Sequence, residues 1–365
     1  MVIVRDILGQ LEQLAPSALA ESWDNVGLLI GDAEQPVQKV LVALDATAAV
    51  LDQASHEDVQ LIITHHPLIF SGMKRLNEDG GTNSLVRRLI REGRSLVATH
   101  TNLDSAPDGL NTYVATLLGI QAPRPLIPSE ARSLLKLVVY VPETHVDAVR
   151  SAICAAGAGH IGHYAECTFG TPGTGTFQPE EGTHPFIGTP GKLERVQEVR
   201  LETVVPKRAL SAVFAAMFAS HPYEEVAYDL FTLENSWPMA GLGRIGNLAT
   251  PMDAGEFVTR VREVLQTDRL VFTGDMARQI KTVALCTGSG GDFAEHAFQS
   301  HADAYLTGEI KHHQALLARQ HGLMLIDAGH YPTERPAVNL LAEYLTAKNG
   351  DLEIIRAIEE DPFRL

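Results

Sequence analysis

Short apolar runs alternate with helical stretches along the first third of the chain. Residues 40–44, 59–63 and 95–98 are dominated by Val, Leu, Ile and Ala, with the length and composition of strands buried on both faces. Residues 84–91, between two of these runs, have apolar positions at helical spacing. Strand and helix in alternation predict an α/β layer structure with a largely parallel sheet.

The last third of the chain repeats this pattern. Three more apolar runs, with helical stretches between them, cover residues 282–286, 302–306 and 323–326. The residues after the strands also correspond, because His100 and Asp104 follow one run at the spacing H-x3-D. His330 and Glu334 follow another at the spacing H-x3-E. We therefore predict a duplicated α/β domain that is formed by both ends of the chain.

The middle of the chain has a different character. Two units of strand, Val-Pro and helix begin near residues 137 and 201, and a last strand covers residues 226–231. Proline suits the first turn of a helix, and two strand–helix–strand units form a ferredoxin-like α+β module. Residues 170–191 are rich in Gly, Pro and Thr and are predicted to form a long hairpin or loop.

These patterns predict three segments. Residues 1–125 and 238–365 are expected to be the two halves of the larger α/β domain, and residues 126–237 to be a module inserted between them. A length of 365 residues suits two or three domains.

Charge and cysteine usage narrow the classes of function. The formal charge of −16 argues against DNA binding, because phosphate binding needs clustered Lys and Arg. A nucleotide ligand stays compatible, since a bound metal ion supplies positive charge locally. The three cysteines are far apart and lack CxxC spacing, so we expect no disulfides, no thiolate zinc site and a cytoplasmic location. The N-terminus has the pattern of an amphipathic helix, and no apolar run approaches the about 18–20 residues that span a bilayer, so we expect no membrane partner.

Histidine and carboxylate side chains follow the predicted strands of both halves. Ligand sites in parallel α/β folds form at the carboxyl ends of strands, and a carboxylate there can bridge two cations about 3.5–4 Å apart. We predict a two-metal site with the ligands His65, His66, Asp104, His330 and Glu334. This mixed nitrogen and oxygen set suits zinc first, with iron, manganese or cobalt as alternatives. The chemistry it predicts is metal-assisted hydrolysis.

Each ligand candidate also has a purely structural explanation. The two adjacent histidines can lie on a surface or in a turn. Asp104 can cap a helix that starts near Asp108, and Glu334 can pair with a helix N-terminus.

Other positions near the strand ends are weaker candidates. His100 is a further ligand, a residue that orients Asp104, or a proton carrier, and His313 is a general acid or base, or a histidine on a helix surface. Residues 23–25, Trp-Asp-Asn, line the pocket or pack at a turn, and the glycines of residues 288–291 cradle a phosphate or form an ordinary turn. The chain has neither a P-loop nor a GxSxG motif.

Taken together, these motifs resemble the dinuclear-metal-centre family of GTP cyclohydrolase 1 type 2 homologues. The matching segments are residues 21–27 (ESWDNVG), 63–67 (ITHHP), 100–104 (HTNLD), 307–313 (TGEIKHH) and 329–334 (GHYPTE). Segments that match the longer bacterial branch are residues 159–164, 167–169, 173–177 and 221–225. The likeness follows the chain in order and covers nearly all of it.

The resemblance implies the same five metal ligands that the residue types suggest. It also implies a PII-like inserted domain and a toroidal homohexamer, a trimer of dimers, with metal sites that face an inner cavity. Glu309 stands where many relatives are expected to have Asp. The family name implies that the imidazole ring of GTP opens to a formylated intermediate and then gives dihydroneopterin triphosphate. In that chemistry one metal would activate water for attack on purine C8 and the other would stabilise charge, while His100 or His313 moves the proton.

Two other functions stay open at this point. The same two-metal site would serve a phosphoesterase or another amidohydrolase. Alternatively, the protein is a non-catalytic metal-handling or regulatory binding protein, whose inserted module senses a small molecule or only supports assembly.

Overall fold

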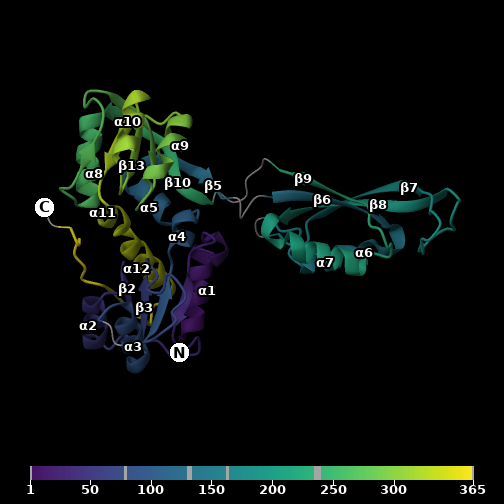
Figure 1. Cartoon of the computed structure of the whole chain (residues 1–365), viewed down its shortest axis with the longest axis horizontal. Helices are drawn as coiled ribbons and strands as arrows, with labels where there is room; N and C mark the ends of the chain where they lie inside the picture. The colour runs from purple at the N-terminus through teal and green to yellow at the C-terminus, as the bar shows by residue number, and fades with distance from the viewer. Residues whose placement is uncertain (1, 78–79, 130–133, 162–163, 234–239, 364–365) are drawn as a thin grey trace. The chain divides into compact units, whose positions relative to one another are not determined.

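The computed structural model describes residues 2–77, 80–129, 134–161, 164–233 and 240–363 (Figure 1). The chain divides into two compact units. Unit 1 comprises Met1–Ser129 and Met239–Leu365, so both ends of the chain build it, and unit 2 comprises Glu130–Pro238. Among the described residues, no helix combines the length and the apolar character that crossing a bilayer requires.

The first sheet of unit 1 has five strands in the order β1-β4-β3-β2-β15. Their bounds are β1 Gly27–Ile30, β2 Lys39–Ala43, β3 Leu61–Thr64, β4 Ser95–Ala98 and β15 Glu353–Arg356. Strands β2, β3, β4 and β15 are parallel, and β1 is antiparallel to β4. Helices α2 (Ala48–His56) and α3 (Thr82–Glu92) connect the parallel strands.

The second sheet of unit 1 has the order β11-β14-β13-β12-β10-β5. Its strands are β5 Ile120–Pro128, β10 Gly241–Asp253, β11 Val271–Phe272, β12 Gln279–Leu285, β13 Ala304–Thr307 and β14 Met324–Asp327. Strands β12, β13 and β14 are parallel, and the other three are antiparallel to their neighbours. Helices α9 (Ala294–Gln299) and α10 (His312–Gln320) connect the parallel strands.

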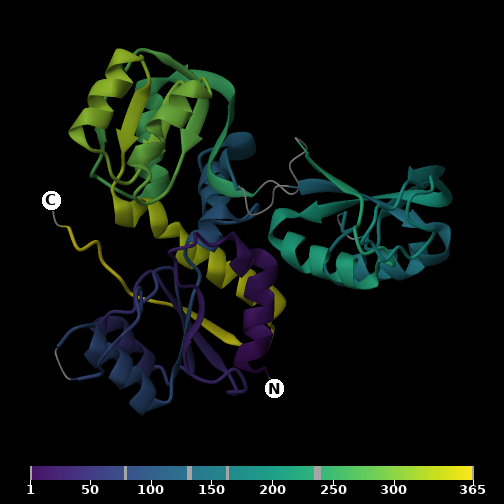
Figure 2. The same cartoon turned by 45° about the vertical axis from the view of Figure 1, so that its right-hand side comes forward.

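One hydrophobic core joins the two sheets. Side chains alternate along each strand, so Val40 and Val42 of β2 face this shared core while Leu41 faces α2 and α3. Leu306 and Ile326 of the second sheet lie in the same core. The other helices of unit 1 are α1 Val4–Leu14, α4 Thr101–Ser105, α5 Leu110–Leu117, α8 Ala254–Leu265, α11 His330–Glu334 and α12 Pro336–Lys348. Figures 1 and 2 show α12 running through the middle of unit 1.

Unit 2 leaves and re-enters the second sheet at one place. Strands β5 and β10 are antiparallel neighbours, with Pro128 paired to Gly241. The Ser129 N–H also donates to the Ala240 carbonyl at 3.0 Å. Unit 2 therefore occupies the position of the turn in a β5–β10 hairpin.

Unit 2 has the element order βαββαβ and one antiparallel sheet in the order β7-β8-β6-β9. The elements are β6 Leu134–Pro142, α6 Val146–Ala155, β7 Thr168–Phe177, β8 Glu194–Pro206, α7 Leu210–Ser220 and β9 Tyr228–Thr232. Both helices pack on one face of the sheet (Figure 1), where Val139, Leu201 and Met217 share a core.

The alternation in the sequence correctly predicts a mixed α/β fold, and each predicted apolar run overlaps a strand. The stretch 170–191 differs in part, since residues 170–177 belong to β7 and pair with β8. Glycine and proline are tolerated there because β7 is an edge strand, in which a missing N–H costs no ladder bond. The boundary predicted at 237/238 and residues 162–163 of the motif at 159–164 lie outside the described residues.

Arg244 of β10 is a buried cation that joins distant parts of unit 1. Its side chain is almost fully buried. Its guanidinium donates to Thr112 Oγ1 at 2.6 Å, to the Gly241 and Gly243 carbonyls at 2.7 Å each, and to the Ala106 carbonyl. No carboxylate of the described residues forms an ion pair with it, so carbonyl dipoles alone compensate its charge.

We expect Arg244→Met to lower the free energy of unfolding by about 3 kcal/mol or more, because three buried carbonyls would lose their donors. Chemical denaturation followed by circular dichroism measures this change. Arg91→Met is the matched control, since Arg91 is exposed and the change should stay within about 0.5 kcal/mol. Equal stability of the two variants would contradict a structural role for Arg244.

Candidate metal centre

The carboxyl ends of three parallel strands of unit 1, β3 and β4 from the first sheet and β14 from the second, deliver the candidate ligands. His65 and His66 follow β3, and their backbone N–H groups still donate to the Ala43 and Leu44 carbonyls, so the strand geometry continues. His65 is fully buried and His66 is partly exposed. Their rings nevertheless lie 5.1 Å apart, because the strand ends at the site rather than passing it.

Asp104 and Glu334 reach the same point from short helices. Asp104 lies in α4, directly after β4. Glu334 lies in α11, which follows β14 and begins at His330. His330 and Glu334 are therefore one turn apart on the same helix face.

Four histidines share one arrangement of their two ring nitrogens. In each, Nδ1 contacts an oxygen acceptor at 2.8–2.9 Å, and Nε2 is left for the centre of the site. The pairs are His65 with the Thr99 carbonyl, His66 with Asp45, His100 with Asp24, and His330 with Glu309. Metal-binding histidines have this pattern, because an acceptor on one nitrogen fixes the tautomer and aims the other.

The Glu334 carboxylate is the hub of the centre. Its Oε2 lies 2.9 Å from His66 Nε2 and 2.8 Å from His330 Nε2. Its Oε1 faces His65 Nε2 at 3.9 Å. The side chain is only 5 % exposed, so the imidazoles of His66 and His330 hold a carboxylate charge inside the protein.

Two buried atoms of the centre lack a hydrogen-bond partner among the described residues, His65 Nε2 and Asp104 Oδ1, which lie 3.7 Å apart. The Thr99 carbonyl can only accept, so His65 carries its proton on Nδ1 and presents a lone pair at Nε2. Burial lowers the pKa of His65 to about 3, which keeps the ring neutral. A lone pair and a carboxylate oxygen that face each other need a cation between them. Their separation suits two ligands that each lie about 2.0–2.2 Å from one ion, so this pair fits a divalent metal.

Without a metal, shared protons hold the other side of the centre together. Burial opposes charge on His66, yet its hydrogen bonds with Asp45 and Glu334 raise its pKa to about 10. The hydrogen bond with Glu334 raises the pKa of His330 to about 9. Burial would raise the pKa of Glu334, but the same hydrogen bonds lower it far below its usual value. The protons on His66 Nε2 and His330 Nε2 lie where a cation would otherwise contact Glu334 Oε2.

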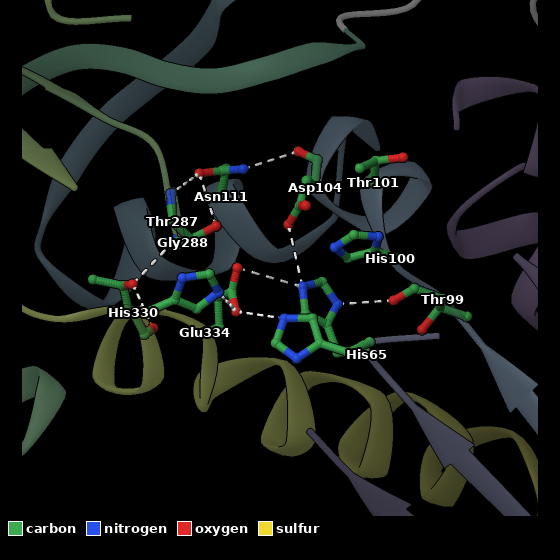
Figure 3. Close-up of polar contacts among 12 residues, drawn as sticks. His65, Thr99, His100, Thr101, Asp104, Asn111, Thr287, Gly288, His330 and Glu334 are labelled. Atoms are coloured by element: carbon green, nitrogen blue, oxygen red, sulfur yellow. Dashed lines mark hydrogen bonds and ion pairs between the residues drawn. The ribbon is translucent and has the colours of Figure 1, made fainter. Parts of the chain in front are cut away.

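Neutral side chains fix the helices that carry the acids (Figure 3). Asn111 donates to the Asp104 carbonyl at 3.1 Å and accepts from the Thr287 N–H at 2.9 Å, so it joins α4 to the loop after β12. Thr333 accepts from the Gly288 N–H at 3.1 Å and donates to carbonyls of its own helix. The loop at residues 287–290 thereby packs against α11.

The structure brings all five predicted ligands together. Two groups of candidate ligand atoms each lie within 4.8 Å of one another, His65 with His66 and His100, and His66 with His330 and Glu334. Asp104 joins them through His65. His100 thus lies in the centre. His313 is exposed on α10, and no contact between His313 and the five predicted ligands is seen among the described residues.

Sequence reasoning missed the residues that orient the ligands. Asp24 was noted only as part of a Trp-Asp-Asn turn, yet its buried carboxylate holds His100 and Thr101, and these bonds outweigh burial and lower its pKa to about 2. Asp45 directly follows the apolar run 40–44, the same local signal that marks His65, and could have been found in that way. Nothing near Asn111 in the sequence suggests a role at the centre. Glu309 was noted only as an unusual acid, and it orients His330.

Comparison with known proteins gives a consistent result. The profile of the Duf34/NIF3 (NGG1p interacting factor 3) family matches residues 2–362. A GTP cyclohydrolase 1 type 2 homolog from Halalkalibacterium halodurans is 40% identical over 361 residues, which are 98% of this chain and 97% of the relative. The resemblance found in the motifs is therefore confirmed over nearly the whole chain.

Solved structures agree with the sequence comparison. The crystal structure of a Bacillus cereus protein related to NIF3 has a TM-score of 0.73 at 38% identity and covers 100% of this chain and 99% of its own. The crystal structure of a Staphylococcus aureus protein has a TM-score of 0.79 at 30% identity, with the same coverage. The fold of these proteins is thus the fold of this chain.

Gly288 offers a test of the centre that changes no ligand. A methyl group on Gly288 would overlap Glu334 Oε1, and it would lie 3.5 Å from His330 Nε2. We expect Gly288→Ala to displace Glu334 and to weaken metal affinity about 10–100-fold, as loss of an orienting contact does. Metal content per chain after dialysis against buffered zinc, measured by mass spectrometry, gives the change.

The matched control is Gly93→Ala. Gly93 has the same positive φ of 64° as Gly288, but a Cβ there meets nothing within 4 Å. The control therefore carries the same backbone strain without the overlap, and it should keep the metal. Equal metal loss in both variants would show that strain, not contact with Glu334, is responsible.

Proposed function

Since this chain belongs to the Duf34/NIF3 family, we propose that it is a hydrolase that uses two divalent metal ions. The observation that carries the proposal is the set of three Nε2 atoms, those of His65, His66 and His330, around the buried Glu334 carboxylate, with His65 Nε2 and Asp104 Oδ1 left unsatisfied. His65, Asp104 and Glu334 Oε1 would hold one ion, and His66, His330 and Glu334 Oε2 the other. Zinc is the first choice, with iron, manganese or cobalt as alternatives. When bound, the ions would lower the pKa of a water molecule and stabilise negative charge that develops on oxygen.

His100 is the proposed proton carrier. Asp24 holds its Nδ1 at 2.9 Å, and the buried Asp24 carboxylate stabilises the imidazolium that forms when Nε2 takes a proton. Its ring lies 5.2 Å from that of His65 and 5.4 Å from that of His66. His100 can therefore receive a proton from water beside the ligands and return it to a leaving group.

An aromatic surface beside His100 supports a flat heterocyclic substrate. Trp23 and Phe70 are stacked at 5.7 Å with an angle of 22° between their planes, and both rings meet His100 edge-on. Trp23 is 56% exposed and Phe70 is 52% exposed, so both rings are open to solvent. A purine that packs on exposed rings gains stacking energy and would present its edge to His100.

Basic residues lie close to this surface in the chain. Lys74 and Arg75, both exposed, line an open groove of about 540 Å³ together with Phe70. In a chain of net charge −16 they are a local source of positive charge for a polyphosphate. The rings of Trp23 and Phe70 would thus contact the base of a nucleoside triphosphate, and Lys74 and Arg75 would contact its phosphates.

GTP ring opening is the reaction that we propose. Relatives carry the name GTP cyclohydrolase 1 type 2 homolog. Water would add at purine C8, and the C8–N9 bond would break with a proton delivered to N9 from His100. A second water would release C8 as formate, and rearrangement of the ribose followed by ring closure, with loss of one water, would give dihydroneopterin triphosphate. A phosphoesterase or another amidohydrolase is the alternative enzyme, and a metal-handling or regulatory binding protein is the alternative without turnover.

The proposal extends to architecture and assembly. The halves 1–125 and 238–365 are proposed to be duplicates, supported by the matching strand orders β1-β4-β3-β2 and β11-β14-β13-β12. The inserted domain is proposed to be ferredoxin-like and related to PII proteins, supported by its βαββαβ order. A toroidal homohexamer, a trimer of dimers, is proposed on family resemblance, and analytical ultracentrifugation tests it.

We expect zinc-loaded protein to convert GTP to formate and a pterin, which becomes fluorescent after oxidation. Asp104→Asn should reduce this turnover about 100-fold or more, because it removes a ligand charge. Phosphate release with an intact purine ring would favour the phosphoesterase, and no turnover of any nucleotide with full metal content would favour the binding protein. Either result would overturn the ring-opening proposal.

His100→Gln separates proton transfer from metal binding. We expect it to keep the metal content and the KM for GTP but to lower kcat about 100-fold, as loss of a general acid–base does. His313→Gln tests the other candidate and should change kcat less than about twofold if His100 carries the proton. Metal loss in His100→Gln would instead make His100 a ligand, and a larger loss in His313→Gln would make His313 the carrier.

A further inference from the structure

Unit 2 contains a cavity that uses no residue of the metal centre. Its volume is about 410 Å³, within the range of small-molecule sites. Strands β6, β7 and β8 form its floor, and residues from the loop between β7 and β8 and from the segment after α7 form its walls. All of its lining residues belong to unit 2, so the cavity depends on this unit alone.

Aromatic rings form one side of the cavity. Tyr223 lies between Phe177, at 5.6 Å and an interplanar angle of 60°, and Phe186, at 6.5 Å and 50°. Tyr223 is thus strongly inclined to both neighbours, and neither forms a parallel slot with it for a flat base. Inclined rings of this kind surround a compact group from several directions.

Carboxylates form the other side. Glu198, Glu224 and Glu225 all line the cavity, and no Lys or Arg is among its described lining residues. Glu198 accepts from the Tyr223 hydroxyl at 2.9 Å, and no cationic side chain of the described residues pairs with it. Burial and this hydrogen bond raise the pKa of Tyr223, so its hydroxyl stays protonated and donates to Glu198.

The surrounding residues hold these groups in place. His221 accepts from the Tyr223 N–H at 3.1 Å and donates to the Tyr140 carbonyl at 3.0 Å, which anchors Tyr223 to β6. Glu224 accepts from the His184 N–H at 3.0 Å and so ties the loop of Phe186 to the same segment. Gly175 of β7 leaves room for the Glu198 carboxylate, which a Cβ there would overlap. The motif at residues 221–225 is therefore the wall of a preformed cavity.

We propose that this cavity binds a small organic cation, an alkylammonium or guanidinium compound, whose charged group lies between the Tyr223 ring and the Glu198 carboxylate. Aromatic faces attract cations through their quadrupole, and a carboxylate without a cationic partner among the described residues adds charge complementarity. The three carboxylates disfavour phosphates and other anions. The proposal does not depend on the reaction at the metal centre.

Calorimetric titration of the full, metal-loaded chain tests the proposal with three probes. Choline and agmatine represent the two kinds of cation, and 3,3-dimethylbutan-1-ol is the neutral compound of the same shape as choline. We expect at least one cation to bind about tenfold or more tightly than the neutral alcohol, since only the cation gains the charge-dependent attraction. Glu198→Gln, which keeps the shape and the hydrogen bond from Tyr223, should remove most of this preference.

Two controls locate the binding. Glu143→Gln removes an exposed charge of unit 2 outside the cavity and should change the affinity less than about twofold. Asp104→Asn alters the metal centre and should leave cation binding unchanged. The proposal fails if the cations bind no better than the alcohol, if a nucleoside or nucleotide binds in their place, or if Glu198→Gln binds cations like the wild type while its circular dichroism shows a folded chain.

Discussion

The centre of unit 1 depends on one buried carboxylate. Glu334 has its charge inside the protein, and imidazoles contact both of its oxygens. A buried carboxylate without such partners would take up a proton or destabilise the fold. Its partners come from β3 and from its own helix, so the ends of two different sheets must meet at this point. The shared hydrophobic core between the sheets fixes that meeting, because neither sheet can move without opening the core.

Hydrogen-bond acceptors around the four histidines, and not a metal ion, fix the orientation of the imidazole rings. Each of the four histidines has its Nδ1 bound before any ion arrives, so only Nε2 remains for the ion. The acceptors differ in exposure. The Thr99 carbonyl and Asp24 are buried, whereas Glu309 is more than half exposed. The His65 side of the centre is therefore more deeply buried than the His330 side.

Strand patterns predicted the mixed α/β fold and the side chains that gather at the centre, but not the contacts that hold these side chains. The ends of β3, β4 and β14 are marked by polar residues directly after apolar runs, which is a local signal. Asn111 joins Asp104 to Thr287, residues far apart in the chain, and no local pattern can show such a contact. The sequence suggests Gly288 as part of a phosphate loop or an ordinary turn. In the structure, the absence of a side chain at Gly288 leaves room for the Glu334 carboxylate, and only the three-dimensional packing shows this contact.

The point at which unit 2 enters unit 1 also follows from physical constraints. A long insertion in a turn costs little extra entropy when its ends are already adjacent, and β5 and β10 hold theirs together by sheet pairing. The start of β10 lies at the carboxyl end of β12, because Arg244 pairs with Leu285. The guanidinium of Arg244 also binds the Ala106 carbonyl, two residues after Asp104. Strand β10 is thus bonded to the segment that carries Asp104. The position of Asp104 therefore depends on the pairing of β10 with its neighbouring strands as well as on the contacts within the centre.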